Sequence, residues 1–105
     1  MEQLTALQRD MMFAVAGLES PNGREVQREL ERTQDREFVS GHVYTVFEEL
    51  VTAGLLEKSR RNGRSNEYRL TETGRSWLGN RCRWQNSYVA LGGLAGQSGL
   101  QTAQD

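Results

Sequence analysis

The chain has 105 residues and a formal net charge of −1, from 13 basic and 14 acidic residues. This length predicts one domain with a modest core, which a second copy of the chain would help to cover, so we expect a dimer. A net charge near zero excludes a uniformly basic nucleic-acid-binding protein. Any such function must come from an uneven distribution of charge.

Several other classes of protein are excluded. No apolar run approaches the roughly 18 residues of a membrane span, and the N-terminus lacks a signal-peptide pattern, so we expect a cytoplasmic protein without membrane contact. The only cysteine, Cys82, lacks partners for an internal disulfide or a metal site, and is either structural or half of an intermolecular redox bridge. One histidine and no convergent carboxylates leave no recognisable catalytic or metal site, so we expect no enzyme activity, metal or cofactor.

A first helix is predicted from Thr5 to about Leu18, because Thr5 and Gln8 have the spacing of a capping box. Its main apolar face consists of Leu4, Leu7, Met11, Ala14, Val15 and Leu18. Phe13 lies on the opposite side, either as a stray exposed aromatic or in contact with another helix. We favour the second alternative.

A second helix is predicted from Asn22 to about Thr33, where Asn22 and Glu25 form another capping box. Only Val26 and Leu30 face inward. The glutamates of this helix are interleaved with Arg24, Arg28 and Arg32. These charges predict a solvated face rather than a binding site.

The third predicted helix, from Ser40 to about Ala53, organises the rest of the chain. Ser40 is the expected N-cap, and Phe38 and Val39 are expected to tuck beneath the helix. Its buried stripe is Val43, Val46, Phe47, Leu50 and Val51. The opposite face begins with a polar cluster, Ser40, Gly41, His42, Tyr44 and Thr45. A helix N-terminus favours anions, so this cluster suits contact with a phosphate backbone.

A two-stranded hairpin follows the helix stop at Gly54. The predicted strands are Leu55–Arg61 and Ser65–Leu70, joined by the turn signal Asn62-Gly63, which fixes their register. Because successive side chains of a strand point to opposite faces, Leu56, Tyr68 and Leu70 are expected to face the core. The residues near the exposed tip are Arg60, Arg61 and Arg64.

Basic charge is concentrated in this hairpin. Residues 57–69 hold five Lys and Arg against two Glu, whereas residues 1–56 hold five Arg against ten acidic residues. An arginine-rich tip of this kind can enter the minor groove of DNA. The alternative is that the charges only protect an edge strand from association, but the acidity of the preceding residues favours DNA binding.

A fourth helix, capped by Thr71 and running to about Ala90, carries an aromatic stripe. The stripe consists of Trp77, Arg81, Trp84, Tyr88 and Leu91. Because a large aromatic side chain buries roughly 150–250 Å², we expect the stripe to be covered by a second copy, through the same helix or Phe13. The alternative is that these residues complete the core of one chain. A flexible tail is predicted from Gly92 onwards.

Three helices followed by a basic hairpin resemble the winged-helix variant of helix-turn-helix proteins. The residues also resemble the PadR-like transcriptional regulators, especially their short archaeal members. One matching motif is Gly41, Val43, Tyr44, Phe47, Leu50, Gly54 and Leu55, and the other is Tyr68, Leu70, Thr71, Gly74, Arg75 and Leu78. The resemblance covers about Leu4 to Tyr88 and departs at Thr45, where the family usually has proline.

The sequence therefore predicts a mainly α winged helix-turn-helix protein with a small β-hairpin. Its parts are a DNA-binding domain (1–72), a dimerisation helix (73–91) and a flexible tail (92–105). The expected function is a homodimeric regulator of transcription, most simply a repressor, that binds double-stranded DNA. The expected DNA contacts are Ser40, Gly41, His42, Tyr44, Thr45, Arg60, Arg61 and Arg64, and the expected dimer contacts are Phe13, Trp77, Arg81, Trp84, Tyr88 and Leu91.

The alternative function is a winged-helix module that binds another protein and does not read DNA. In that case the aromatic helix is the binding surface and the basic hairpin only keeps the protein solvated. The sequence identifies neither an operator nor a small-molecule effector.

Overall fold

The computed structural model describes residues 3–94. These residues form α1 (Ala6–Gly17), α2 (Gly23–Gln34), α3 (Ser40–Thr52), β1 (Leu56–Arg60), β2 (Asn66–Leu70) and α4 (Glu72–Leu91). The strands form one antiparallel pair, so the predicted fold class is confirmed. The chain divides into two compact units, residues 1–75 and 76–105, and the boundary falls inside α4.

Two capping boxes begin the first two helices, as predicted. The Thr5 hydroxyl accepts from the Gln8 N–H (3.1 Å), and the Gln8 side chain accepts from the Thr5 N–H (2.7 Å). Asn22 and Glu25 make the same reciprocal pair at the start of α2, with both distances 2.8 Å. These bonds satisfy N–H groups that the first turn of a helix leaves free.

The start of α3 differs from the prediction. Val39, not Ser40, is the N-cap residue, and no side chain caps the helix. Ser40 is the first helical residue, and its hydroxyl donates to the Gln27 side chain (3.2 Å). Val39 is 75% exposed, so the expectation that it lies beneath the helix is also wrong. A valine cannot cap a helix, so the position of this start depends on contacts with α2.

Two side chains of α2 hold the loop before α3. The Gln27 amide donates to the Phe38 carbonyl (3.0 Å), and the Phe38 N–H donates to the Glu31 carboxylate (3.0 Å). The bond from the Phe38 N–H lowers the pKa of Glu31. Phe38 itself is buried, as predicted. The N-terminus of α3 is thereby fixed relative to α2.

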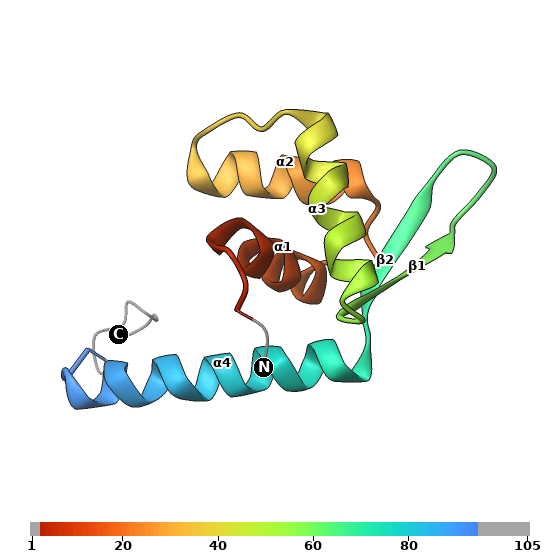
Figure 1. Ribbon diagram of the computed structural model, residues 1–105. Coiled ribbons are helices and arrows are strands. Elements are labelled where there is room, and N and C mark those ends of the chain that lie inside the picture. The colour runs from red at the N-terminus through yellow and green to blue at the C-terminus, as the bar shows by residue number, and fades with distance from the viewer. Residues whose placement is uncertain (1–2, 95–105) are drawn as a thin grey trace. The chain divides into compact units, whose positions relative to one another are not determined.

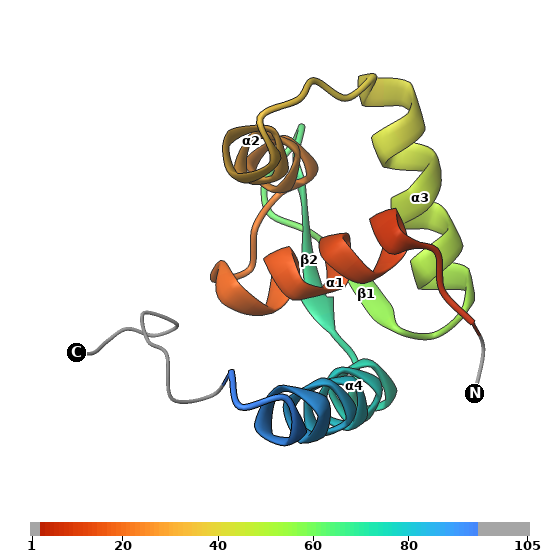
Figure 2. The same cartoon turned by 90° about the vertical axis from the view of Figure 1, so that its left-hand side faces the viewer.

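An apolar core lies between the three helices and the inner side of the hairpin (Figure 1). In Figure 2, α2 is seen nearly end-on, while α1 and α3 are seen from the side. The buried residues include Met11, Met12, Val15, Val26, Leu30, Val43, Val46, Phe47, Leu50, Leu55, Leu56 and Tyr68. Met12 is fully buried although it lies off the predicted face, because α1 packs against α2, α3 and β2.

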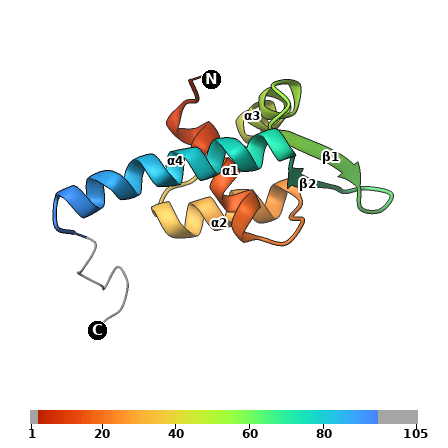
Figure 3. The ribbon, with the colours of Figure 1, turned by 90° about the horizontal axis from the view of Figure 1, so that it is seen from below.

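The hairpin projects from the helices (Figure 3), and its turn is built differently from a two-residue Asn-Gly loop. Arg60 pairs with Asn66, whereas a two-residue loop would place Ser65 opposite Arg60. The Asn62 side chain accepts from the Arg64 N–H (2.9 Å) and the Ser65 N–H (3.0 Å). The Asn-Gly pair lies in the turn as predicted, but the asparagine side chain organises it.

The hairpin is joined to both flanking helices at one junction. Gly54 ends the α3 segment with φ +79°, a conformation that favours glycine. The Thr71 hydroxyl donates to the Gly54 carbonyl (2.6 Å) and accepts from the Gly74 N–H (3.0 Å), so the predicted cap of α4 is confirmed. Gly74 is buried against the carbonyl of Leu55.

The second unit begins at Ser76, within α4, and includes the C-terminal end of that helix. The Gly92 N–H donates to the Tyr88 carbonyl and the Leu94 N–H to the Val89 carbonyl (both 2.9 Å), with Gly93 at φ +72°. The first residues of the predicted tail therefore close the end of α4. The rest of that tail, residues 95–105, lies outside the described residues. Within residues 3–94, no helix is long and apolar enough to cross a membrane.

Substitution of Gly74 tests the junction. A Cβ at this position would lie 2.1 Å from the Leu55 carbonyl oxygen, so Gly74→Ala should lower the free energy of unfolding by about 1–3 kcal/mol in urea titrations. Gly17→Ala is the matched control, because nothing lies within 4 Å of its Cβ. Equal stability of the two variants would contradict the close approach.

Candidate nucleic-acid interface

The N-terminal part of α3 presents the predicted polar face to solvent. Ser40, Gly41, His42, Tyr44 and Thr45 are all exposed. Of the predicted buried stripe, Val43, Val46, Phe47 and Leu50 are buried, whereas Val51 is only half-buried. The Thr45 hydroxyl donates to the Gly41 carbonyl (3.0 Å). Its proton is therefore occupied, and the oxygen is left to accept a hydrogen bond from a ligand.

The ring of Tyr44 lies against the first residue of α2. A Cβ at Gly23 would be 2.5 Å from the Tyr44 ring and 2.8 Å from its hydroxyl oxygen, so only glycine leaves room for the ring in this position. Tyr44 remains 44% exposed, and its ring centroid is 6.1 Å from that of Phe47. Contact with α2 thus orients an exposed side chain of α3.

Tyr68 joins the hairpin to α3 and to the loop between α1 and α2. Its ring stacks on Phe47, with centroids 4.0 Å apart and planes at 15°. Its N–H donates to the Pro21 carbonyl (2.9 Å). Burial raises the pKa of Tyr68 to about 12, and the nearby Glu48 and Tyr44 act in the same direction. The hairpin is therefore held by both a packed ring and a backbone hydrogen bond.

The three predicted arginines of the hairpin differ in their contacts. Arg60 donates to the Gly63 carbonyl (3.1 Å), within the hairpin itself. Arg61 contacts Ser20, Glu25 and Glu67. For Arg64, no side-chain hydrogen bond or ion pair occurs within residues 3–94. Among the other hairpin cations, Lys58 pairs with Glu48 (2.8 Å), and Arg69 lies 3.9 Å from Glu57.

One cleft connects α2, α3 and the hairpin. It is lined by Asn22, Gly23, Arg24, Tyr44, Arg64, Ser65, Asn66 and Tyr68. Of the predicted DNA-contacting residues, the structure brings Tyr44 and Arg64 together here. The other six do not line the cleft. Arg24 also lines the cleft, although its sequence pattern predicted a solvated face. The signal that could have identified Arg24 is its position just after the N-cap of α2.

The aromatic residues of α4 differ in exposure. Trp77 is 6% exposed, whereas Trp84 is 53%, Tyr88 58% and Leu91 81% exposed. The rings of Trp84 and Tyr88 meet edge to face at 5.1 Å, and the Arg81 guanidinium lies 4.7 Å from the Trp84 ring centre. Phe13, in the other unit, is half-buried. Cys82 is exposed, and the described part of the chain contains no metal-binding cluster.

A three-helix core, a projecting two-stranded hairpin and an exposed α3 N-terminus define a winged helix-turn-helix protein. Residues 12–80 match the transcriptional regulator PadR-like family, and the chain belongs to that family. The resemblance seen in the sequence is thereby confirmed. The chain is a DNA-binding transcriptional regulator and not an enzyme.

Several solved structures are similar to this chain. RosR of H. salinarum, in crystals grown from NaBr, has a TM-score of 0.78 and 33% identity, and the match covers 83% of this chain and 78% of RosR. The complex structure of RosR-S1 has a TM-score of 0.78, 34% identity and the same coverage. FabT of Streptococcus pneumoniae in complex with DNA has a TM-score of 0.72 and 19% identity, and the match covers 91% of this chain and 64% of FabT. At this identity the similarity shows only that the fold is shared. No curated protein matches the chain.

The alkaline titration of Tyr68 tests how firmly the hairpin is packed. Because the pKa is about 12 in the folded state and about 10 in an unfolded chain, the stability that Tyr68 contributes is complete below pH 10 and is lost as pH rises from 10 to 12. Of the three tyrosines, one should ionise late in an absorbance titration, and Tyr68→Phe should remove that step. Ionisation of all three near pH 10 would contradict this packing.

Proposed function

We propose that this protein is a homodimeric repressor that binds a pseudo-palindromic operator in double-stranded DNA. In this proposal the N-terminal part of α3 enters the major groove, and the hairpin tip contacts the adjacent minor groove. Base contacts come from His42, Tyr44 and Thr45, while Ser40 and Gly41 allow the helix to approach a phosphate closely.

The observation that carries this proposal is the shared cleft of α2, α3 and the hairpin. Tyr44 of α3 and Arg64 of the hairpin line it together with Arg24 of α2. One phenol and two guanidinium groups from three different elements can contact a single stretch of phosphate backbone. This arrangement would fix the register of α3 in the groove.

The distribution of charge further supports DNA as the ligand. Arg64 is exposed at the tip, and Arg60 is exposed beside it. Glu48 and Glu49 lie further along α3 and would repel phosphates, so contact is confined to the start of the helix. If a dimer neutralises roughly eight phosphates, the logarithm of the binding constant should fall with the logarithm of salt concentration at a slope of about −7.

The exposed aromatic surface of α4 supports a dimer. Trp84, Tyr88 and Leu91 form an apolar surface that an identical surface could cover, with Arg81 at its edge. Of the other predicted dimer contacts, Trp77 and Phe13 have less exposed surface to contribute. A two-fold dimer would set two copies of α3 about 34 Å apart, facing half-sites one helical turn apart. Repression then follows if the occupied operator excludes the transcription machinery in the cytoplasm.

Salt-dependent DNA binding of an arginine variant tests the proposed interface. A binding site is first selected from randomised duplexes, and affinity is then measured at several salt concentrations. Arg64→Gln should weaken binding and reduce the magnitude of the salt slope by about 2, because two phosphate contacts are lost per dimer. Arg32→Gln is the matched control, since Arg32 lies at the other end of α2 and pairs with Glu29 (2.8 Å).

Two results would contradict the proposal. If no duplex sequence is enriched, specific DNA reading fails, and a protein-binding module becomes the better account. If Arg64→Gln and Arg32→Gln have the same affinity and slope as the parent protein, the hairpin tip does not contact DNA.

Sedimentation of an α4 variant tests the dimer. The parent protein should sediment at twice the chain mass of 11.9 kDa at micromolar concentration, and Trp84→Ser should sediment as a monomer with unchanged helix content. Asn86→Ser, at another exposed position of α4, is the control. A monomeric parent protein, or a dimer that persists in Trp84→Ser, would show that this surface does not join two copies.

A further inference from the structure

Arg61 connects the base of the hairpin loop to the start of α2. Its Nη2 donates to the Ser20 carbonyl (2.7 Å) and to Glu25 Oε1 (3.1 Å). Its Nε lies 3.7 Å from the carboxylate of Glu67. We propose that Arg61 is a positioning residue, which holds the hairpin at a fixed orientation to α2 and α3 without contacting DNA itself. This inference rests on the proposed function and refines the role of one predicted DNA contact.

The acceptors of Arg61 are held in place by features that do not involve the arginine. The Glu25 carboxylate also accepts from the Asn22 N–H (2.8 Å) in the capping box. That bond and then Arg61 lower the pKa of Glu25, so the carboxylate is charged at neutral pH. Ser20 has φ +43°, which few residues other than glycine adopt, and its carbonyl accepts from the arginine.

The contacts of Arg61 extend a backbone connection between the same segments. The Tyr68 N–H donates to the Pro21 carbonyl (2.9 Å), and Asn22 forms an isolated antiparallel bridge with Glu67. These bonds hold the middle of β2. Arg61 adds a bond one position beyond the last paired residue of β1, where the loop begins. It therefore acts where the hairpin would otherwise be free to bend.

The partners of Arg61 argue against a direct contact with phosphate. Its charge is already shared between two carboxylates, and its side chain is only 32% exposed. Arg64 has no such partner among the described residues. To bind phosphate, Arg61 would have to leave Glu25 and Glu67. The two roles predict opposite effects for neutralising Glu25, because the ion pair that positions the hairpin would be weakened, whereas a phosphate-binding arginine would be released.

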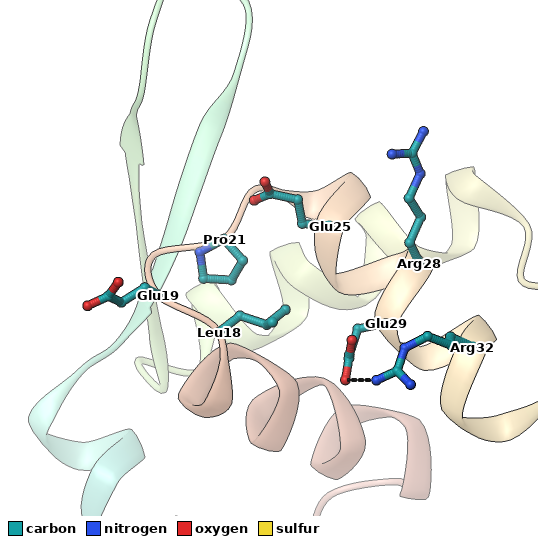
Figure 4. A pocket seen from close by; sticks show the side chains of 7 residues that line it. All are labelled: Leu18, Glu19, Pro21, Glu25, Arg28, Glu29 and Arg32. Atoms are coloured by element: carbon teal, nitrogen blue, oxygen red, sulfur yellow. Dashed lines mark hydrogen bonds and ion pairs between the residues drawn. The ribbon is translucent and has the colours of Figure 1, made fainter.

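The experiment compares Glu25→Gln with Glu29→Gln. Both remove one carboxylate from α2, and glutamine at position 25 can still complete the capping box. Glu29 forms an ion pair with Arg32 of the same helix (Figure 4) and does not contact the hairpin. Glu25→Gln should weaken DNA binding about three- to tenfold although it removes a negative charge, whereas Glu29→Gln should not weaken it.

Variants of Arg61 complete the test. Arg61→Gln should weaken binding at least as much as Glu25→Gln, because it removes the contacts with Ser20, Glu25 and Glu67. The double variant should bind no more weakly than Arg61→Gln alone, because the ion pair with Glu25 is already lost in Arg61→Gln. Arg61→Lys should recover part of the affinity. Tighter binding by Glu25→Gln, or additive losses in the double variant, would overturn the proposal.

Amide exchange of the free protein separates this inference from the proposed function. In Glu25→Gln and Arg61→Gln, the Tyr68 N–H bonded to Pro21 should exchange at least about threefold faster than in Glu29→Gln. The Arg61 N–H, bonded to Ser65 inside the hairpin (2.8 Å), should show no comparable increase in Glu25→Gln. Unchanged Tyr68 exchange would refute the positioning role whether or not the protein binds DNA.

Discussion

The packing of Tyr68 on Phe47 is the contact on which the rest of the arrangement depends. It joins the inner side of the hairpin to the buried face of α3, at a centroid distance of 4.0 Å. The backbone of the same tyrosine is bonded to the loop before α2 (2.9 Å). A winged-helix protein can present a helix and a hairpin to one ligand only if the two are held together. Tyr68 contributes to this through its ring, which packs on α3, and through its backbone N–H, which bonds to the loop before α2.

Ion pairs on the surface add to this packing and determine which cations remain unpaired. The chain as a whole is nearly neutral, and three of the five cations in residues 57–69, Lys58, Arg61 and Arg69, are paired with glutamates of the same chain. Pairing decides which of the hairpin arginines are available to a ligand. Arg64 is available, whereas Arg61 is held by Glu25 and Glu67. An arginine-rich segment therefore contains residues with different roles, and their partners within the fold separate these roles.

Much of the fold could be predicted because its signals are local. Capping boxes at Thr5 and Asn22, helical spacing in α3 and the presence of a hairpin were confirmed, and each signal lies within a few residues. The register that a two-residue Asn-Gly turn would fix was wrong, because Arg60 pairs with Asn66. The start of α3 was misplaced because Gln27 and Glu31 of the preceding helix, 11 and 7 residues from Phe38, hold that loop. The partners of Arg61 and the place of Arg24 in the cleft were missed for the same reason: both depend on tertiary contacts.

We propose that α3, the start of α2 and the hairpin tip form one DNA-contacting surface. Amide chemical-shift mapping of the parent protein, titrated with its selected duplex, tests this most directly. We predict the largest shifts at residues 40–45, at Arg24 and around Arg64, with smaller shifts along the C-terminal half of α3. Shifts that leave the hairpin tip and the start of α3 unaffected, and are confined to the Trp84 region of α4, would contradict the account.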